Sequence, residues 1–271
     1  MKKERADQLV LEQGLTTTLE DAKRFIMAGK IYTNKELRID TVGEKLPITT
    51  ELKIKGASPK YVSRGGYKLE KASEAFHISL DGKIMLDIGS STGGFTDAAL
   101  QHGAKLCYSL DVGTNQLVWK LRTDERVVVM EQTNFRTSTL EDFDKGQPEV
   151  ASIDVSFISL DKILPVLKDI IKLDGDVLAL VKPQFEARRE DVGNKGVVRD
   201  PKVHDKVMQK IMSLALSSGF SVEDIDFSPI TGGEGNIEYL MHLTRAEATE
   251  SKVSPEDTAE LVASAHRYFS K

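Results

Sequence analysis

Apolar runs separated by polar, helix-compatible segments fill the middle of the chain. Seven runs are evident, most of them continuous rather than alternating: 84–88, 104–111, 126–130, 150–154, 176–182, 220–227 and 236–243. Continuous apolar runs are typical of strands that are buried on both faces of a parallel sheet. Their alternation with helical segments predicts a doubly wound α/β domain with a mostly parallel sheet. The last two runs are too close for a helical crossover, so we expect them to pair antiparallel.

The first 56 residues have a different pattern. Residues 5–13 predict a helix that Gly14 ends. A second helix follows Thr18, whose spacing to Asp21 is typical of an N-cap, and this helix stops at Gly29. The short pieces K-I-Y-T and L-K-I-K come next and resemble strands. We therefore expect a small α+β domain here.

Changes in these patterns divide the chain. Residues 57–66 contain proline, serine and two adjacent glycines, which is typical of a linker. The expected divisions are a domain at 1–56, the linker at 57–66, the α/β domain at 67–246 and a polar tail at 247–271. Apolar residues at helical spacing predict a helix in the tail: Ala259, Leu261, Val262, Ala265 and Phe269.

Composition changes this picture little, and charge changes it more. The chain has one cysteine, Cys107, five scattered histidines, no 18-residue apolar span and no apolar segment after the basic N-terminus. We expect a cytoplasmic protein without a disulfide, a metal site or a membrane span. The formal net charge is −5, yet residues 1–71 hold 15 basic against 10 acidic side chains. This asymmetry indicates a polyanionic partner at the N-terminal end.

The stretch I-M-L-D-I-G-S-S-T-G-G-F-T-D at 84–97 predicts a strand, a glycine-rich turn and a helix. Ligands of open α/β sheets bind at such strand ends. A triphosphate loop needs a lysine after its last glycine, and none follows Gly94. A dinucleotide site favours glycine where this chain has Ser91. S-adenosylmethionine, which has no phosphate, is the third alternative.

Polar residues at four successive strand ends favour this third ligand. Asp87, Asp111, Asn134 and Asp154 each follow or end an apolar run. Asp111 is placed to accept hydrogen bonds from ribose hydroxyls, and Thr133 and Asn134 to read an adenine edge. The predicted cofactor-binding residues are Asp87, Gly89, Ser90, Ser91, Thr92, Gly93, Gly94, Phe95, Asp111, Val112, Thr133, Asn134 and Asp154.

Several motifs in order resemble the TlyA family. They are S-R-G-G-Y-K-L at 63–69, D-I-G-S-S-T-G-G-F-T-D at 87–97, D-V-S-F-I-S-L at 154–160, V-K-P-Q-F-E at 181–186, G-V-V-R-D-P at 196–201 and G-N-I-E at 235–238. The resemblance covers about residues 1–246. It implies an S4-like RNA-binding domain followed by an FtsJ-like, Rossmann-like class I methyltransferase domain, with S-adenosylmethionine as cofactor. The implied reaction is 2′-O-methylation of a cytidine in ribosomal RNA.

The resemblance also implies a set of site residues. Lys68, Asp154, Lys182 and Glu238 match the family's catalytic lysine–aspartate–lysine–glutamate set. A ribose hydroxyl must lose a proton as it attacks, so the chemistry needs a base and accurate positioning more than a metal. Lys182 is the candidate base, with Asp154 orienting it and Glu238 orienting Lys68.

Basic residues near the N-terminus are the candidates for contact with ribosomal RNA. They are Arg5, Lys23, Arg24, Lys30 and Arg64. The chain has Thr18-Leu19 where the family usually has Ser-Arg, so one expected phosphate contact is missing. A membrane-active haemolysin and a non-catalytic RNA-binding module are the alternative functions. The sequence leaves the ribosomal subunit and the oligomeric state open.

Overall fold

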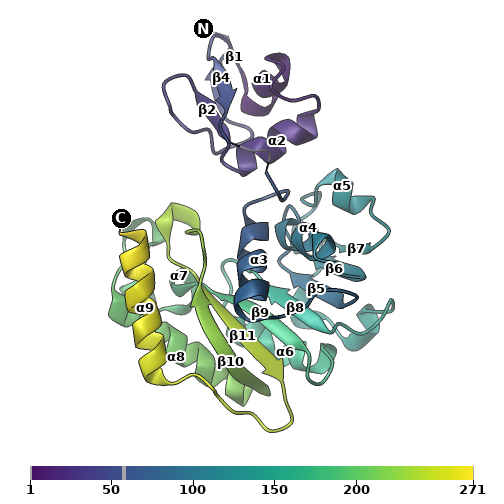
Figure 1. Ribbon diagram of the computed structural model, residues 1–271, viewed down its shortest axis with the longest axis vertical. Helices are drawn as coiled ribbons and strands as arrows, with labels where there is room; N and C mark the ends of the chain where they lie inside the picture. The colour runs from purple at the N-terminus through teal and green to yellow at the C-terminus, as the bar shows by residue number, and fades with distance from the viewer. Residues whose placement is uncertain (1, 57–58, 271) are drawn as a thin grey trace.

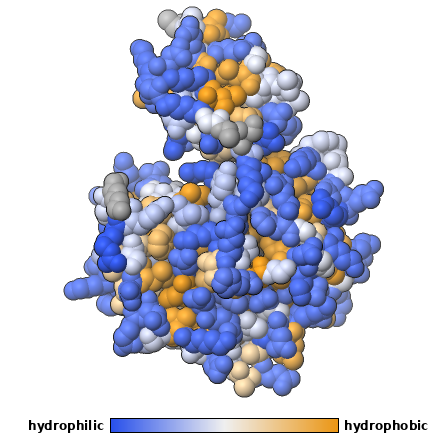
Figure 2. All heavy atoms as spheres, viewed as in Figure 1, coloured by the Kyte–Doolittle hydropathy of each residue, from blue (hydrophilic) through white to orange (hydrophobic). Residues whose placement is uncertain are grey.

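The chain forms a small N-terminal lobe and a larger lobe built on one central sheet (Figure 1). This computed structural model describes residues 2–56 and 59–270. The chain ends and the first two residues of the predicted linker at 57–66 lie outside the described residues. Figure 2 shows that the lobes meet over a narrow waist.

The N-terminal lobe contains two helices and two short antiparallel strand pairs. Its elements are β1 (Lys3–Arg5), α1 (Ala6–Glu12), α2 (Leu19–Met27), β2 (Ile31–Thr33), β3 (Lys45–Pro47) and β4 (Leu52–Ile54). β1 pairs with β3, and β2 pairs with β4. Thr18 caps α2 as predicted, because its side chain accepts a hydrogen bond from the Asp21 N–H. Leu9, Ile26 and Ile31 centre a core of the lobe's own.

The larger lobe has a seven-stranded sheet in the order β10-β11-β9-β8-β5-β6-β7. The strands are β5 (Ile84–Ile88), β6 (Leu106–Leu110), β7 (Val127–Met130), β8 (Val150–Ile153), β9 (Asp176–Val181), β10 (Phe220–Phe227) and β11 (Tyr239–Arg245). β11 pairs antiparallel with both neighbours, and the other pairings are parallel. The predicted fold class and the antiparallel final pair are confirmed.

Helices cover both faces of this sheet. They are α3 (Gly65–Ala75), α4 (Gly94–Gln101), α5 (Trp119–Arg122), α6 (Leu164–Ile170), α7 (Pro183–Glu186), α8 (Pro201–Ser217) and α9 (Pro255–Phe269). Leu69 of α3 and Ala98 of α4 pack into the core on one face. Leu167 of α6, Ile211 of α8 and Val262 of α9 pack into the core on the other. The predicted stripe in the tail therefore forms a helix that docks on the sheet domain.

Two details differ from the sequence-based expectation. α3 begins at Gly65, inside the predicted linker, because Tyr61 and Val62 are already buried in the larger lobe. Gly66 is required there, since a Cβ at that position would lie 2.3 Å from the Tyr61 ring. Between β7 and β8 the described chain forms only short 3₁₀ turns instead of a crossover helix, at Phe135–Thr137 and Leu140–Asp142.

Candidate active site

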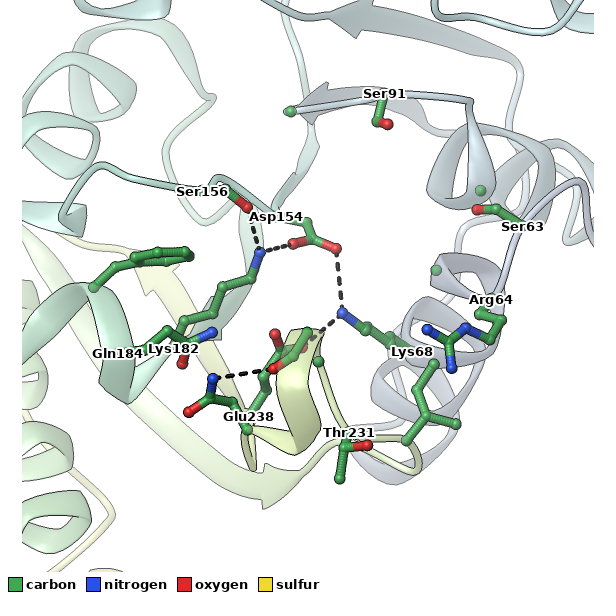
Figure 3. A pocket seen from close by; sticks show the side chains of 18 of the residues that line it. Ser63, Arg64, Lys68, Ser91, Asp154, Ser156, Lys182, Gln184, Thr231 and Glu238 are labelled. Carbon is green, nitrogen blue, oxygen red and sulfur yellow. Dashed lines mark hydrogen bonds and ion pairs between the residues drawn. The ribbon is translucent and has the colours of Figure 1, made fainter. Parts of the chain in front are cut away.

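Four side chains from distant parts of the sequence meet at one edge of the sheet (Figure 3). Lys68 Nζ lies 2.6 Å from Glu238 Oε2 and 3.5 Å from Asp154 Oδ2. Lys182 Nζ lies 2.5 Å from Asp154 Oδ1 and donates to Ser156 Oγ at 3.3 Å. Asp154 thus bridges the Nζ atoms of the two lysines, and all four predicted catalytic residues come together.

The sheet order explains this meeting. Asp154 and Lys182 follow the parallel neighbours β8 and β9, so they leave the sheet at the same edge. Glu238 precedes β11, which runs the opposite way and pairs Tyr239 with Val181. The start of β11 therefore lies beside the end of β9. Lys68 reaches the same point from α3, which packs over the sheet.

The cluster is largely buried, and its charges control one another. Lys68 and Lys182 are each 8% exposed and Glu238 is 2% exposed. Burial acts to lower the pKa of Lys68, but the charges of Asp154 and Glu238 outweigh it and raise that pKa above its ordinary value. Burial acts to raise the pKa of Asp154, and the two lysines outweigh it and hold the pKa below its ordinary value. Lys68 is therefore cationic and Asp154 anionic across the neutral range.

Two cavities adjoin the cluster. The larger one, about 600 Å³, is lined by Arg64, all four cluster residues and part of the glycine turn, among others. The second, about 410 Å³, lies between the ends of β5, β6 and β8. Gly89, Ser91 and Asp154 line both cavities. The arrangement offers one site for a donor and one for an acceptor, with the charged cluster at their junction.

The sequence model of the family described as FtsJ-like methyltransferase matches residues 61–245. That match covers more than half of the chain, including the whole cluster. The chain belongs to the FtsJ-like methyltransferase family. The fold around this methyltransferase's cavities is thus the one that the sequence predicted.

Relatives of this methyltransferase carry names that agree with the predicted resemblance to TlyA. It is 58% identical to "Putative rRNA methyltransferase YqxC" of Bacillus subtilis, over 94% of this chain and 91% of that protein. It is 39% identical to 16S/23S rRNA (cytidine-2′-O)-methyltransferase TlyA of Mycobacterium tuberculosis, over 89% of this chain and 90% of that one. A solved structure described as "Putative hemolysin from Streptococcus thermophilus" is 54% identical, with a TM-score of 0.81, and the match covers 100% of this chain and 98% of that chain. No helix among the described residues is long and apolar enough to cross a membrane.

S-adenosylmethionine is the methyl donor of this methyltransferase, and the second cavity fits it. The carboxylate of Asp111 accepts from the N–H groups of Ser91 at 2.8 Å and Gly113 at 2.7 Å, which fixes it at the cavity wall. Ser90 Oγ is buried and has no hydrogen-bond partner among the described residues; it lies in the wall of the larger cavity, between Gly89 and Ser91, which line both cavities. Gly89 is required at the turn, because a Cβ there would lie 2.4 Å from the Asp154 carbonyl oxygen.

The structure places most, but not all, predicted cofactor-binding residues at a cavity wall. Those that line one or both cavities are Gly89, Ser90, Ser91, Thr92, Gly94, Phe95, Asp111, Val112, Asn134 and Asp154. Asp87, Gly93 and Thr133 line neither of them. Asp87 is fully buried beneath the turn, where it accepts hydrogen bonds from Thr96 and Ser152. A Cβ on Gly93 would lie 2.3 Å from Leu121, so this glycine packs against α5 instead.

The structure adds wall residues that sequence reasoning missed. Gln116 and Ile158 line the second cavity, Gln184 lines the first, and Phe157 lines both. Phe157 has φ of +63° and a side chain that is 90% exposed. An exposed aromatic residue in the left-handed region is a signal of function. The sequence carries no trace of this backbone conformation.

The predicted RNA-contacting residues lie on the surface and are mostly paired. Arg5 pairs with Asp7, Lys23 with Glu20 and Arg24 with Asp21. Lys30 and Arg64 have no ion pair within 2–56 and 59–270, and Arg64 lies at the mouth of the larger cavity (Figure 3). Lys195, which also lines this cavity, is a basic residue that the sequence prediction did not include.

Proposed function

We propose that this methyltransferase transfers the methyl group of S-adenosylmethionine to the 2′-hydroxyl of a cytidine in ribosomal RNA. The observation that carries the proposal is the bridged Lys182–Asp154–Lys68–Glu238 cluster at the junction of two cavities. The names of its relatives supply the substrate: the Mycobacterium tuberculosis relative is named for both ribosomal RNAs, and a 36% identical Campylobacter jejuni relative for 23S rRNA alone.

The residues of the cluster divide the chemistry between them. S-adenosylmethionine supplies a methyl group that its positive sulfur already activates. Lys182 accepts the proton of the 2′-hydroxyl as the methyl group is transferred, and Asp154 accepts a hydrogen bond from the resulting ammonium group. Lys68 has two carboxylate partners and stays cationic, so it positions Asp154 rather than accepting a proton.

The N-terminal lobe supports binding of the acceptor RNA. We assign it as the S4-like domain of 1–56, with Lys23 and Arg24 on one helix and Lys30 beyond its end. Residues of α2, including Lys23 and Met27, face residues of the larger lobe such as Trp119 across a third cavity. Contacts from such a surface to RNA phosphates orient the substrate without reading its sequence. Phe157 offers an exposed ring on which an unpaired base can stack beside the cluster.

The decisive experiment uses purified protein, radiolabelled S-adenosylmethionine and small or large ribosomal subunits isolated from cells that lack the enzyme. After digestion, we expect label in 2′-O-methylcytidine from one or both subunits, and none with the Lys182→Ala variant. Label in a base-methylated nucleoside would contradict the ribose assignment. Absence of label from both subunits, with cofactor binding intact, would contradict the proposed substrate.

A further inference from the structure

The two segments that follow the neighbouring strands β8 and β9 contact each other at three levels. One is residues 154–160, which we call the acceptor loop, and the other is Lys182 with helix α7. Lys182 contacts Asp154 and Ser156 nearest the sheet. The rings of Phe185 and Phe157 pack next, with centroids 4.9 Å apart. Farthest out, the carboxylate of Glu186 holds the end of the acceptor loop.

Glu186 makes the outermost contact with two strong hydrogen bonds. Its Oε2 accepts from Ser159 Oγ at 2.6 Å, and its Oε1 accepts from the Leu160 N–H at 2.7 Å. Glu186 is only 6% exposed, and Lys210 Nζ approaches Oε2 to 3.4 Å from the half-exposed surface of α8. Burying a carboxylate costs free energy unless hydrogen bonds compensate for the lost hydration. Each carboxylate oxygen of Glu186 accepts such a bond. Among the described residues, it belongs neither to the catalytic cluster nor to the walls of the two cavities.

The acceptor loop needs such an anchor. Ser156 and Phe157 form wall common to both cavities. Phe157 has φ of +63° and is 90% exposed, so its contact with the Phe185 ring alone supplies little packing to hold that conformation. A non-glycine residue stays in the left-handed region only where its surroundings over-determine the backbone. The bonds of Glu186 to Ser159 and Leu160 fix the chain two and three residues after Phe157.

We infer that Glu186 is a positioning residue for methyl transfer: it fastens the acceptor loop to α7 and so sets the wall that the donor and acceptor cavities share. It acts through hydrogen-bond geometry rather than through its charge. The inference rests on the proposed function, because its kinetic readout is transfer to ribosomal RNA.

The test compares Glu186→Ala, Glu186→Gln and the control Glu149→Gln. Glu149 is also a partly buried carboxylate that accepts from a backbone N–H, that of Ile84, but it lies at the opposite end of the sheet. We would measure kcat and KM for the subunit that the wild-type protein methylates, together with the affinity for S-adenosylhomocysteine. Assays are run where circular dichroism shows every variant folded.

Glu186→Ala is expected to raise the KM for the subunit about tenfold, which matches the loss of hydrogen bonds to a charged acceptor. Its kcat is expected to fall less. Its affinity for S-adenosylhomocysteine is also expected to fall, by about threefold, because residues 154–158 of the acceptor loop line the second cavity as well. Glu186→Gln can accept from Leu160 and donate to Ser159, so it should stay within about threefold of wild type. Glu149→Gln should match wild type.

Two outcomes would overturn the inference. Unchanged kinetics in folded Glu186→Ala would show a purely structural role, and equal losses in the Gln and Ala variants would show that the charge matters instead. If Glu186→Ala does not fold, Ser159→Ala decides: an increase in KM of about threefold supports the anchor, and no change contradicts it. If the wild-type protein methylates neither subunit, the proposed function fails, and amide hydrogen exchange still tests the anchor. Exchange in 154–162 should accelerate in Glu186→Ala, and unchanged protection would contradict the inference.

Discussion

The catalytic cluster and the N-terminal lobe both pair lysine or arginine with carboxylates, but the pairs differ in burial. The Lys68 and Glu238 side chains are 10% and 3% exposed and lie 2.6 Å apart. The Lys23 and Glu20 side chains on α2 are 32% and 54% exposed and lie 3.1 Å apart. Exposed pairs contribute about 0–1 kcal/mol, whereas removing one member of a buried pair leaves an uncompensated charge.

This difference indicates two uses of the same side chains. In the cluster each charge depends on the others, since Asp154 and Glu238 keep Lys68 protonated and the lysines keep Asp154 ionised. On the N-terminal lobe a phosphate can replace a carboxylate partner at little cost, because water already screens the pair. The cluster is therefore suited to chemistry, and the lobe to reversible contact with a polyanion.

The largest effect is expected from Lys182→Ala. This change removes the proposed base, and general bases contribute on the order of 100- to 10,000-fold to rate. We expect kcat to fall at least about 100-fold while the affinity for S-adenosylhomocysteine, measured by calorimetry, changes within about threefold. A variant that keeps wild-type turnover would remove Lys182 from the mechanism.

Glu238→Gln should have a smaller effect on the same cluster. The substitution keeps the shape of the side chain but removes one of the two charges that hold Lys68. We expect kcat to fall about tenfold, since Lys68 retains Asp154 but is less firmly placed. Glu20→Gln on α2 is the matched control, because it breaks an exposed pair, and single-turnover assays should show wild-type kcat. Equal effects of the two changes would erase the contrast between buried and exposed pairs.

Much of this site could be predicted from the sequence, and the failures have physical causes. The apolar runs predicted the strands, and the strand ends predicted Asp111, Asn134 and Asp154. A continuous apolar run does not show which way the side chain at its end points. Asp87 points into the core, where it is fully buried. Lys68 and Glu238 came from the family resemblance, because their approach to Asp154 depends on the sheet order.

Local sequence patterns did not predict the contacts between loops. The motifs V-K-P-Q-F-E and D-V-S-F-I-S-L were visible in the sequence, but not that Glu186 binds Ser159 and Leu160. The same holds for the early start of α3, which depends on burial of Tyr61 against Gly66. Local spacing predicts elements, and packing between elements decides where they begin and which side chains meet.

A buried charge without a basic partner gives a third case, and Asp87→Asn tests it. Burial raises the pKa of Asp87 to about 6, although hydrogen bonds from Thr96 and Ser152 act in the opposite direction. The ordinary value is about 3.9, so folding favours the protonated form, and this contribution to stability is lost as pH rises through 6.

We therefore expect the free energy of unfolding of the wild type, relative to Asp87→Asn, to fall between about pH 4 and pH 7. The fall is on the order of 1.4 kcal/mol per unit of pKa shift. Urea unfolding of both proteins across this range measures it, with Asp144→Asn as a control at an exposed site. A difference in unfolding free energy that does not vary with pH would mean that burial does not raise the pKa of Asp87.

The smallest effect on the catalytic step, and the sharpest test of the N-terminal lobe, is expected from the double variant Lys23→Ala, Arg24→Ala. Both residues belong to half-exposed pairs on α2, so the unfolding temperature should fall only slightly, and the affinity for S-adenosylhomocysteine should stay at the wild-type value. Affinity for the ribosomal subunit that the wild-type protein methylates should fall about three- to tenfold. The slope of log affinity against log salt concentration should weaken by about 0.7 for each RNA phosphate that the variant no longer neutralises.

Filter binding at several salt concentrations measures both the affinity and this slope. The control is Lys145→Ala, which breaks an exposed pair at the far end of the sheet. If the double variant binds like Lys145→Ala at every salt concentration, α2 does not contact the RNA, and the exposed pairs of this lobe are merely solvated surface.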